Sequence, residues 1–219
     1  LRDGAVQEMA PTAALLAAPA HPYTHSLLAA AAPVPRPVAP PAEAPPLLRA
    51  EGLVAGYGPR DAAGRPAIPV LREIGFSIAP GAVLGVIGES GCGKSTLAQV
   101  IAGLLPAAAG ALLLDGEPLA PAAAGRSRDE LRRIQIVFQM PDMALNPAHS
   151  VRQILARPLQ FYFGLRGQKL ERRIAALLDM VRLPASLAPR LPAGLSGGQK
   201  QRLNLARALA AEPALLLCD

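Results

Sequence analysis

Hydrophobic and polar residues change their spacing several times along the chain, and each change predicts a different element. The segments "LLRAEGLVAGYG" (47–58) and "LREIGFSIAPG" (71–81) are partly alternating and bounded by turn residues, which predicts antiparallel strands. The run "AVLGVIG" (82–88) is continuously apolar, as in a buried parallel strand. Three further strands are predicted at "ALLLDG" (111–116), "IQIVFQ" (134–139) and "ALLLCD" (214–219).

Helical spacing occurs between these strands. A helix is predicted from Lys94, and a second opens at the capping box formed by Ser127 and Glu130 in "SRDELRR". A third has one apolar stripe that faces a core, formed by Leu170, Ile174, Leu177, Leu178 and Val181. Because strands and helices alternate, the sequence predicts an α/β domain around a mostly parallel sheet.

A proline-rich stretch interrupts the pattern. "AAPVPRPVAPPAEAPP" (31–46) has no periodic apolar face, so it predicts a semi-rigid extended linker between residues 1–30 and a domain at 47–219. Hydrophobic residues make up 51% of the chain, which is ample for a core. Since Pro, Gly or a charge interrupts every apolar run before about 18 residues, no membrane span is predicted and any membrane role requires a partner.

Charge and cysteine usage narrow the class of protein. The net charge of +6 suits a polyanion, an acidic membrane surface or nucleotide phosphates. The arginines are interleaved with acids at helical spacing and lack neighbouring aromatic residues, which argues against a dedicated nucleic-acid binder. Cys92 and Cys218 form no CxxC pattern, which favours reduced thiols in a cytosol over a disulfide framework or a zinc site.

The stretch "GESGCGKST" (88–96) follows a predicted strand and opens a predicted helix, which is the context of a phosphate-binding loop. Its glycines let successive backbone N–H groups point at phosphates, and the N-terminus of the following helix contributes a partial positive charge. Lys94 is expected to reach the β- and γ-phosphates, and the Ser95 hydroxyl to ligate Mg²⁺. The expected nucleotide contacts are Gly88, Glu89, Ser90, Gly91, Cys92, Gly93, Lys94, Ser95 and Thr96.

Asp219 ends an apolar run, "EPALLLCD", that predicts a buried strand. An isolated aspartate at a strand end is usually an ordinary turn residue. In a protein with a phosphate-binding loop, however, a carboxylate in this position typically holds Mg²⁺, commonly through water. We therefore predict that Asp219 is a metal-binding residue.

A second glycine-containing stretch, "LSGGQKQR" (195–202), also begins a helix. Ser196 with Gln199 reads as a capping box, while Gly197 and Gly198 let an anion approach the amides of the helix start. Together with the phosphate-binding loop, this stretch resembles the signature motif of ABC-type ATPases. The resemblance implies that these four residues contact the γ-phosphate bound by a partner ATPase domain.

The same resemblance gives roles to other positions. Gln139 matches the Q-loop glutamine, implied to sense Mg²⁺ and the attacking water, so the implied catalytic residues are Lys94 and Gln139. The implied Mg²⁺ site consists of Ser95, Gln139 and Asp219. Tyr57 matches the aromatic residue that stacks on adenine, and a turn residue at a strand end is the less favoured alternative. The stretch "MPDMALNPAHSVRQIL" (140–155) resembles the segment that faces the coupling helices of a permease.

A finer resemblance comes from "RDGAVQEMAPTAALLAAPAHPYTHSLLAAAAP", which is similar to the tail after the ATPase domain in oligopeptide and nickel importers. Such a tail belongs at a C-terminus, and here it precedes a second domain. Residues 1–30 are therefore expected to be the C-terminal tail of an upstream ABC ATPase domain, with 47–219 as an ABC ATPase domain ending at Asp219. The 219-residue chain therefore resembles a segment that spans the junction between two ATPase domains fused in tandem.

The resemblance implies a P-loop fold with an antiparallel β subdomain and a helical subdomain. It also implies an ATP- and Mg²⁺-dependent subunit that couples hydrolysis to uptake of peptides or a related small solute. The expected partners are a second ATPase domain, in the same polypeptide or a dimer, transmembrane permease subunits and, indirectly, an extracytoplasmic solute-binding protein, with no nucleic acid. The expected location is peripheral, on the cytoplasmic face of the bacterial inner membrane.

Two alternatives stay open from sequence. One is a non-transport ABC-type ATPase that acts on nucleic acid or the ribosome, and the other is a nucleotide-binding remnant that does not hydrolyse ATP. The family's general-base glutamate directly follows the aspartate matched by Asp219, so the 219-residue chain alone is not expected to turn over ATP. The sequence does not indicate which solute is carried.

Overall fold

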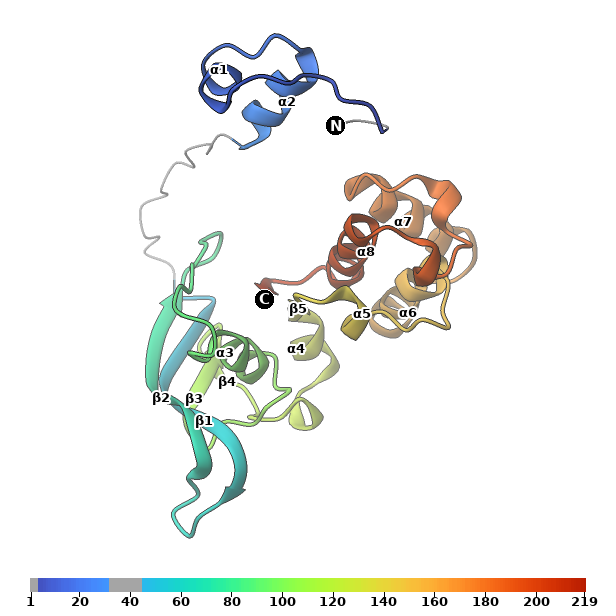
Figure 1. The fold of residues 1–219 in the computed structure, drawn as a ribbon. Helices are drawn as coiled ribbons and strands as arrows, with labels where there is room; N and C mark the ends of the chain where they lie inside the picture. Colours follow the sequence, from blue (N-terminus) through green and yellow to red (C-terminus); the bar gives the residue numbers. More distant parts are fainter. Residues whose placement is uncertain (1–3, 32–44) are drawn as a thin grey trace. The chain divides into compact units, whose positions relative to one another are not determined.

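The computed structural model describes residues 4–31 and 45–219, and the chain divides into two compact units, 1–40 and 41–219 (Figure 1). The first unit contains helices α1 (Thr12–Ala17) and α2 (Pro22–Ala31), neither of which has a buried residue. The Glu8 carboxylate accepts hydrogen bonds from the backbone N–H groups of Ala20 (2.8 Å) and His21 (3.2 Å), just before α2. Most of the predicted linker, 32–44, lies outside the described residues.

The second unit begins with a four-stranded antiparallel sheet in the order β2-β1-β3-β4. Its strands are β1 (Leu48–Arg60), β2 (Pro66–Ile78), β3 (Ala109–Leu114) and β4 (Glu117–Pro118), which confirms the predicted strands in this region. The β1 and β2 backbones approach closely at Gly56, where a Cβ atom would lie 2.0 Å from the Ile68 carbonyl oxygen. Only glycine fits at that position.

Helix α3 (Lys94–Ile101) starts at the predicted residue and shares one hydrophobic core with this sheet. It contributes Leu97, Val100 and Ile101 to that core. A 3-10 turn, η1 (Ala123–Gly125), leads to helix α4 (Arg128–Arg133). The predicted capping box of Ser127 and Glu130 is present, which confirms the start of α4.

A short parallel sheet joins β5 (Ile134–Val137) to β6 (Leu215–Cys218). A second core lies among the helices that follow β5, and it buries the predicted apolar stripe of α7. The elements of this helical region are α5 (Pro141–Ala144), α6 (Val151–Phe163), α7 (Gly167–Met180), η2 (Ala185–Leu187), η3 (Pro192–Gly194) and α8 (Gly197–Leu209). Across residues 4–31 and 45–219, no helix has both the length and the apolar character needed to cross a membrane.

The prediction of a buried strand at 82–88 was wrong. This segment forms no strand and every residue in it is exposed, including Val83 at 79% and Ile87 at 96%. A parallel strand must pair its backbone N–H and C=O groups with neighbouring strands, but β5 pairs only with β6 in the described residues. The sheet content described is accordingly mainly antiparallel, and the parallel part is the β5–β6 pair alone.

Candidate functional site

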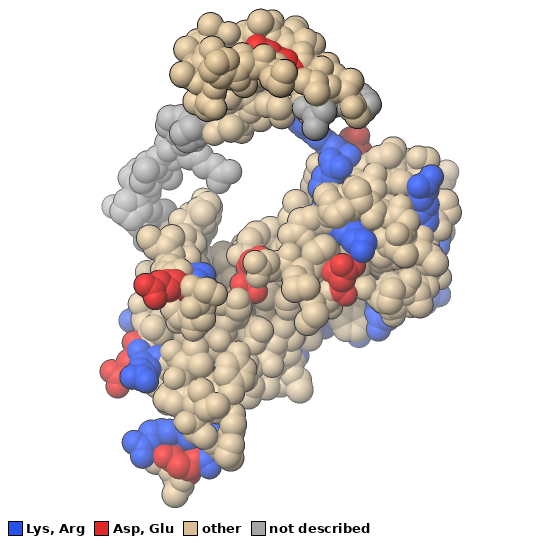
Figure 2. Space-filling view, in the orientation of Figure 1, with Lys and Arg blue, Asp and Glu red and all other residues tan. Residues whose placement is uncertain are grey.

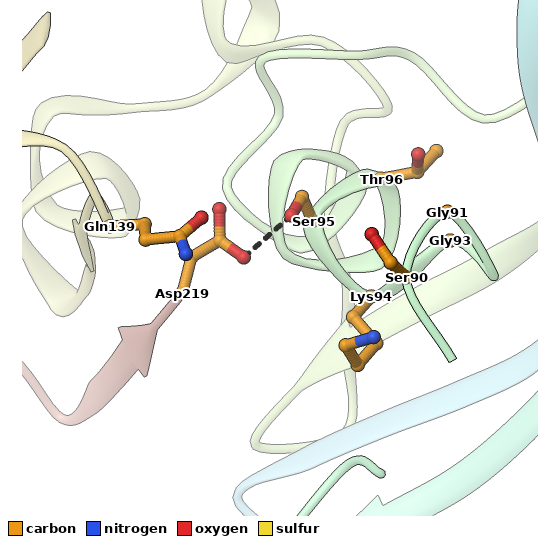
Figure 3. Close-up of a pocket in the computed structure, with 8 residues that line it drawn as sticks. All are labelled: Ser90, Gly91, Gly93, Lys94, Ser95, Thr96, Gln139 and Asp219. Carbon is orange, nitrogen blue, oxygen red and sulfur yellow. Dashed lines mark hydrogen bonds between the residues drawn. The ribbon is translucent and has the colours of Figure 1, made fainter. Parts of the chain in front are cut away.

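Three separate segments of the second unit meet around a pocket of about 420 Å³ (Figure 3). They are the loop before α3 with the first turn of that helix, the residue after Phe138 and the residue after β6. The lining residues are Ser90, Gly91, Gly93, Lys94, Ser95, Thr96, Gln139 and Asp219. The structure therefore brings together most of the phosphate-binding loop with the two distant polar residues predicted from sequence.

The conformation of the loop requires glycine at particular points. Gly91 and Gly93 have φ values of +82° and +105°, which L-residues with a side chain rarely adopt. Gly93 is also the N-cap residue of α3, and a Cβ atom there would lie 2.9 Å from Val70 Cγ1. Such a turn directs backbone N–H groups toward one point at a helix start, where an anion binds favourably.

The Lys94 side chain turns back onto its own loop (Figure 3). Its Nζ donates hydrogen bonds to the carbonyl oxygens of Gly88 (2.8 Å) and Glu89 (2.7 Å), and it lies 3.7 Å from Cys92 Sγ. Gly88, Glu89 and Cys92 thus position the lysine and are not among the lining residues of the pocket.

Ser95 and Asp219 form the direct link between the loop and the parallel sheet. The Ser95 Oγ donates a hydrogen bond of 2.7 Å to Asp219 Oδ1, although the two residues are far apart in sequence (Figure 3). The backbone N–H of Asp219 donates to the Val137 carbonyl oxygen at 3.0 Å, which anchors the carboxylate at the end of β6. The Gln139 side chain lies beside Asp219 on the same wall of the pocket (Figure 3).

These donors fit a Mg²⁺ ion. A hydroxyl, a carboxylate and an amide oxygen are hard ligands of the kind that Mg²⁺ prefers, and Mg²⁺ usually keeps several waters in addition. Ser95 and Asp219 already converge within hydrogen-bond distance, so their oxygens lie close enough to serve one ion directly or through water.

Tyr57 lies beside the first turn of α3 and does not line the pocket. Its hydroxyl is 3.1 Å from the hydroxyl of buried Thr96 and donates to Gln99 Oε1 at 3.5 Å. The residue is 43% exposed, so one part of the ring is fixed by α3 while another faces solvent.

The residues of the signature-like stretch lie at the start of α8 and not in the pocket. The predicted capping box is confirmed, because the Gln199 N–H donates to Ser196 Oγ at 3.3 Å and the Ser196 N–H donates to Gln199 Oε1 at 2.9 Å. An added Cβ at Gly197 or Gly198 would meet no atom within 4 Å. The exposed Gly197 and Gly198 carry no side chain that would block an approach to their backbone.

Sequence reasoning missed two buried polar groups that support the site. The Arg126 guanidinium donates to the carbonyl oxygens of Ile101 (2.7 Å) and Ala120 (2.9 Å), and thereby places a cation at the C-terminal end of α3. Burial lowers the pKa of Arg126.

Asn204 of α8 is fully buried and donates to the Phe138 carbonyl oxygen at 2.9 Å. Only the placement of Asn204 between Leu203 and Leu205 hinted at a buried polar group.

On the face of the second unit shown in Figure 2, Lys and Arg are interspersed with Asp and Glu. Several of the charged side chains form ion pairs, such as Arg152–Glu171 and Lys200–Asp142. This face offers no continuous basic track for a nucleic-acid backbone.

Comparison with protein families decides the classification. The family model described as ABC transporter matches residues 71–219, which include the pocket and the start of α8. This chain belongs to the ABC transporter family. The resemblance noted from the phosphate-binding loop and the signature-like stretch is thereby confirmed.

Several relatives of known name belong to importers. The chain is 39% identical over 153 residues to the oligopeptide transport ATP-binding protein OppF of Haemophilus influenzae, covering 69% of this chain and 46% of that protein. It is 39% identical over 174 residues to the nickel import ATP-binding protein NikE of Brucella suis biovar 1, covering 79% and 65%. The chain spans about half the length of the first curated relatives that it matches.

Solved structures agree on the fold. The ATP-binding cassette MJ0796, solved as a dimer bound to ADP and Pi, superposes with a TM-score of 0.69 at 27% identity, covering 78% of this chain and 73% of that one. The cbiO1 protein of Clostridium perfringens, part of the cbiONQ complex, gives 0.65 at 30% identity, covering 80% and 65%. The predicted P-loop fold of the ABC type, with an antiparallel β region and a helical region, is confirmed.

Proposed function

We propose that this chain is the nucleotide-binding part of an ABC importer subunit, and that it binds ATP with Mg²⁺ in the pocket around Lys94. The observation that carries the proposal is the convergence of the phosphate-binding loop with Gln139 and Asp219 in one pocket of an ABC family member. The loop amides and Lys94 bind the phosphates, so Lys94 must leave its carbonyl partners when nucleotide enters.

Ser95, Asp219 and Gln139 would hold the metal. When bound, Mg²⁺ would neutralise negative charge on the β- and γ-phosphates. Asp219 accepts a hydrogen bond from Ser95 and keeps this hydroxyl turned into the pocket. Gln139, which lies beside Asp219, would orient the attacking water, and Tyr57 would stack on the adenine ring with the exposed part of its side chain.

A second ATPase domain completes the site. The amides of Gly197 and Gly198 lie outside this chain's own pocket, which suits contact with a phosphate bound by another copy or a tandem partner. The dimer described for the cassette MJ0796 supports this arrangement. Closure of the two domains around ATP and their reopening after hydrolysis would drive transport.

The permease partner docks on the segment 140–155. A cavity of about 490 Å³ lies next to it, between β5, α6 and α8, and Phe161 and Tyr162 line part of its wall. Met140 and Met143 of the same segment are 62% and 78% exposed. Exposed methionines on this segment, together with aromatic side chains in the cavity, suit an apolar helix of a membrane subunit.

The importer assignment rests on the names of the relatives. They are oligopeptide and nickel import proteins, so peptides or a related small solute are the proposed cargo. We place the protein at the cytoplasmic face of the bacterial inner membrane as a peripheral subunit, served indirectly by an extracytoplasmic solute-binding protein.

The first unit fits the tail of an upstream ATPase domain. Its two helices bury no residue, so they gain little stability from their own packing. We propose a natural polypeptide with two ATPase domains in tandem, joined through residues 31–46. Intact mass spectrometry of the natural product tests this: roughly 500 residues or more supports the fusion, and one domain's mass contradicts it.

The 219-residue chain alone binds nucleotide without turning it over, because the resemblance places the general base outside this sequence. Phosphate release from the purified chain tests this statement. Mg²⁺-dependent release that disappears in a Lys94→Ala variant would refute it.

Solute uptake by cells carrying the full-length protein tests the function itself. The Lys94→Ala variant should abolish uptake of labelled peptide or Ni²⁺, since the phosphates lose their cation. Lys169→Ala, which removes an exposed lysine from α7 outside the pocket, is the matched control and should keep uptake. Normal uptake with Lys94→Ala, at equal protein level, would contradict the proposal.

A further inference from the structure

One face of α8 runs along the segment that contains Gln139. Lys200, Asn204 and Arg207 recur at intervals of four and three residues, so they lie on one side of the helix. Lys200 Nζ pairs with Asp142 Oδ1 at 2.7 Å. Asn204 Nδ2 donates to the Phe138 carbonyl oxygen at 2.9 Å, and Arg207 Nη2 donates to the Ile136 carbonyl oxygen at 3.2 Å. We call these three side chains the α8 polar track.

The track supplies hydrogen bonds that a neighbouring strand would otherwise provide. β5 pairs with β6 along one edge, where the Val137 carbonyl oxygen accepts from the Asp219 N–H. The carbonyls of Ile136 and Phe138 point to the other edge and would be unsatisfied without the side chains of α8. Arg207 Nη2 also lies 3.4 Å from Asn204 Oδ1, so the two side chains support one another.

Asn204 holds the point at which the chain leaves β5 for the pocket. Phe138 directly precedes Gln139, whose side chain lies beside Asp219 (Figure 3). Asn204 is fully buried, and the donor bond to Phe138 is the reason a polar group is stable there. Ser196 lies on the same side of α8, four residues before Lys200, so one rigid helix joins the signature turn to the Gln139 segment over about 12 Å.

We propose that Asn204 is a positioning residue for Gln139, and that the α8 polar track transmits the position of the signature turn to the Mg²⁺ side of the pocket. This inference rests on the proposed function. A displacement of α8 by a group bound at the signature turn would move the Phe138 carbonyl, and with it Gln139, because the Asn204 Nδ2 bond joins this carbonyl directly to the helix.

A double-mutant cycle in the full-length protein tests the proposal. Asn204→Ala keeps a good helix former, and it should lower kcat for ATP about tenfold while the KM for ATP stays within about twofold. In a Gln139→Ala background the same change should lower kcat by less than about twofold, since the residue to be positioned is gone. Equal losses in the two backgrounds would overturn the proposal, as would an unchanged kcat in the first.

Hydrogen exchange gives a readout that does not depend on hydrolysis. Amides in the peptide 138–142 should exchange about five- to tenfold faster in Asn204→Ala than in the wild type. The control is Leu203→Val, which trims a neighbouring buried side chain of the helical core without touching β5. Unchanged exchange in Asn204→Ala, or equal acceleration in Leu203→Val, would overturn the proposal even if the protein proved to have no ATPase activity.

Asn204→Ser separates loss of the hydrogen bond from loss of folding. It keeps a hydroxyl donor, one bond closer to the helix than Asn204 Nδ2, and should recover part of kcat and part of the exchange protection relative to Asn204→Ala. If Asn204→Ala does not fold, Asn204→Ser must still show accelerated exchange confined to 138–142. General acceleration across α6, α7 and α8 instead would assign Asn204 to core stability alone.

Discussion

Gly93 is the residue of the phosphate-binding loop for which the structure predicts the largest cost of an added side chain. Its φ of +105° is strained for any L-residue with a Cβ, which costs about 1–2 kcal/mol. The new Cβ would also lie 2.9 Å from Val70 Cγ1 and 3.2 Å from Leu71 Cδ2, and Leu71 is part of the core of the β sheet. Overpacking of this kind adds about 1–3 kcal/mol.

Gly93→Ala should therefore lower the free energy of unfolding by about 2–5 kcal/mol. Gly91→Ala is the matched control, because Gly91 also has a positive φ, +82°, yet nothing lies within 4 Å of its added Cβ. The control should lose only the backbone part, about 1–2 kcal/mol. Urea titration of the full-length protein measures both. If the two variants lose the same free energy, the contact of the loop with β2 is not the cause.

Three further variants test separate contacts. Hydrogen bonds from Ser127 hold the pKa of Glu130 below its ordinary value of 4.5. The stabilisation of the fold by the ionised Glu130 is therefore complete above about pH 5 and is lost as the pH falls through the lowered pKa. Glu130→Gln should flatten the acid side of a Tm-against-pH curve, and an unchanged slope would count against the capping box. Gly103→Ala places a Cβ 2.8 Å from the Ala123 backbone nitrogen, at a φ of +75°, and should lower the free energy of unfolding by about 2–4 kcal/mol in urea titration. Tyr57→Phe loses the hydroxyl contacts with Thr96 and Gln99 and should keep the Kd for ATP within about twofold, while Tyr57→Ala weakens ATP binding about tenfold. Equal Kd values for Tyr57→Ala and wild type, from equilibrium dialysis, would rule out stacking.

Elements defined by local chemistry were predictable from the sequence. The capping boxes at Ser127 and Ser196 and the glycines before Lys94 depend on residues a few positions apart, and the structure has them as predicted. The burial of the α7 stripe followed from its periodicity in the same way. Such features depend on short-range hydrogen bonds and backbone sterics, which composition and spacing record directly.

Several features that depend on distant partners were not predictable, apart from the convergence of Gln139 and Asp219 on the loop, which the family resemblance implied. The apolar run 82–88 has the composition of a buried strand, but a strand forms only where neighbouring strands satisfy its backbone groups. The link from Asn204 to the Phe138 carbonyl joins residues that no sequence period relates. The hydroxyl contact of Tyr57 with Thr96 likewise arises from the packing of β1 against α3, so the sequence predicted the residue and not its partner.

The proposed Mg²⁺ site is tested by the dependence of ATP binding on Mg²⁺, measured by equilibrium titration of the full-length protein. We predict that Mg²⁺ tightens ATP binding in the wild type. Asp219→Asn should reduce this tightening at least about tenfold, because the carboxylate that faces Ser95 loses its charge. Binding of ATP that is equally sensitive to Mg²⁺ in the wild type and in Asp219→Asn would contradict the metal site, and no binding of ATP at all would contradict the assignment of the pocket.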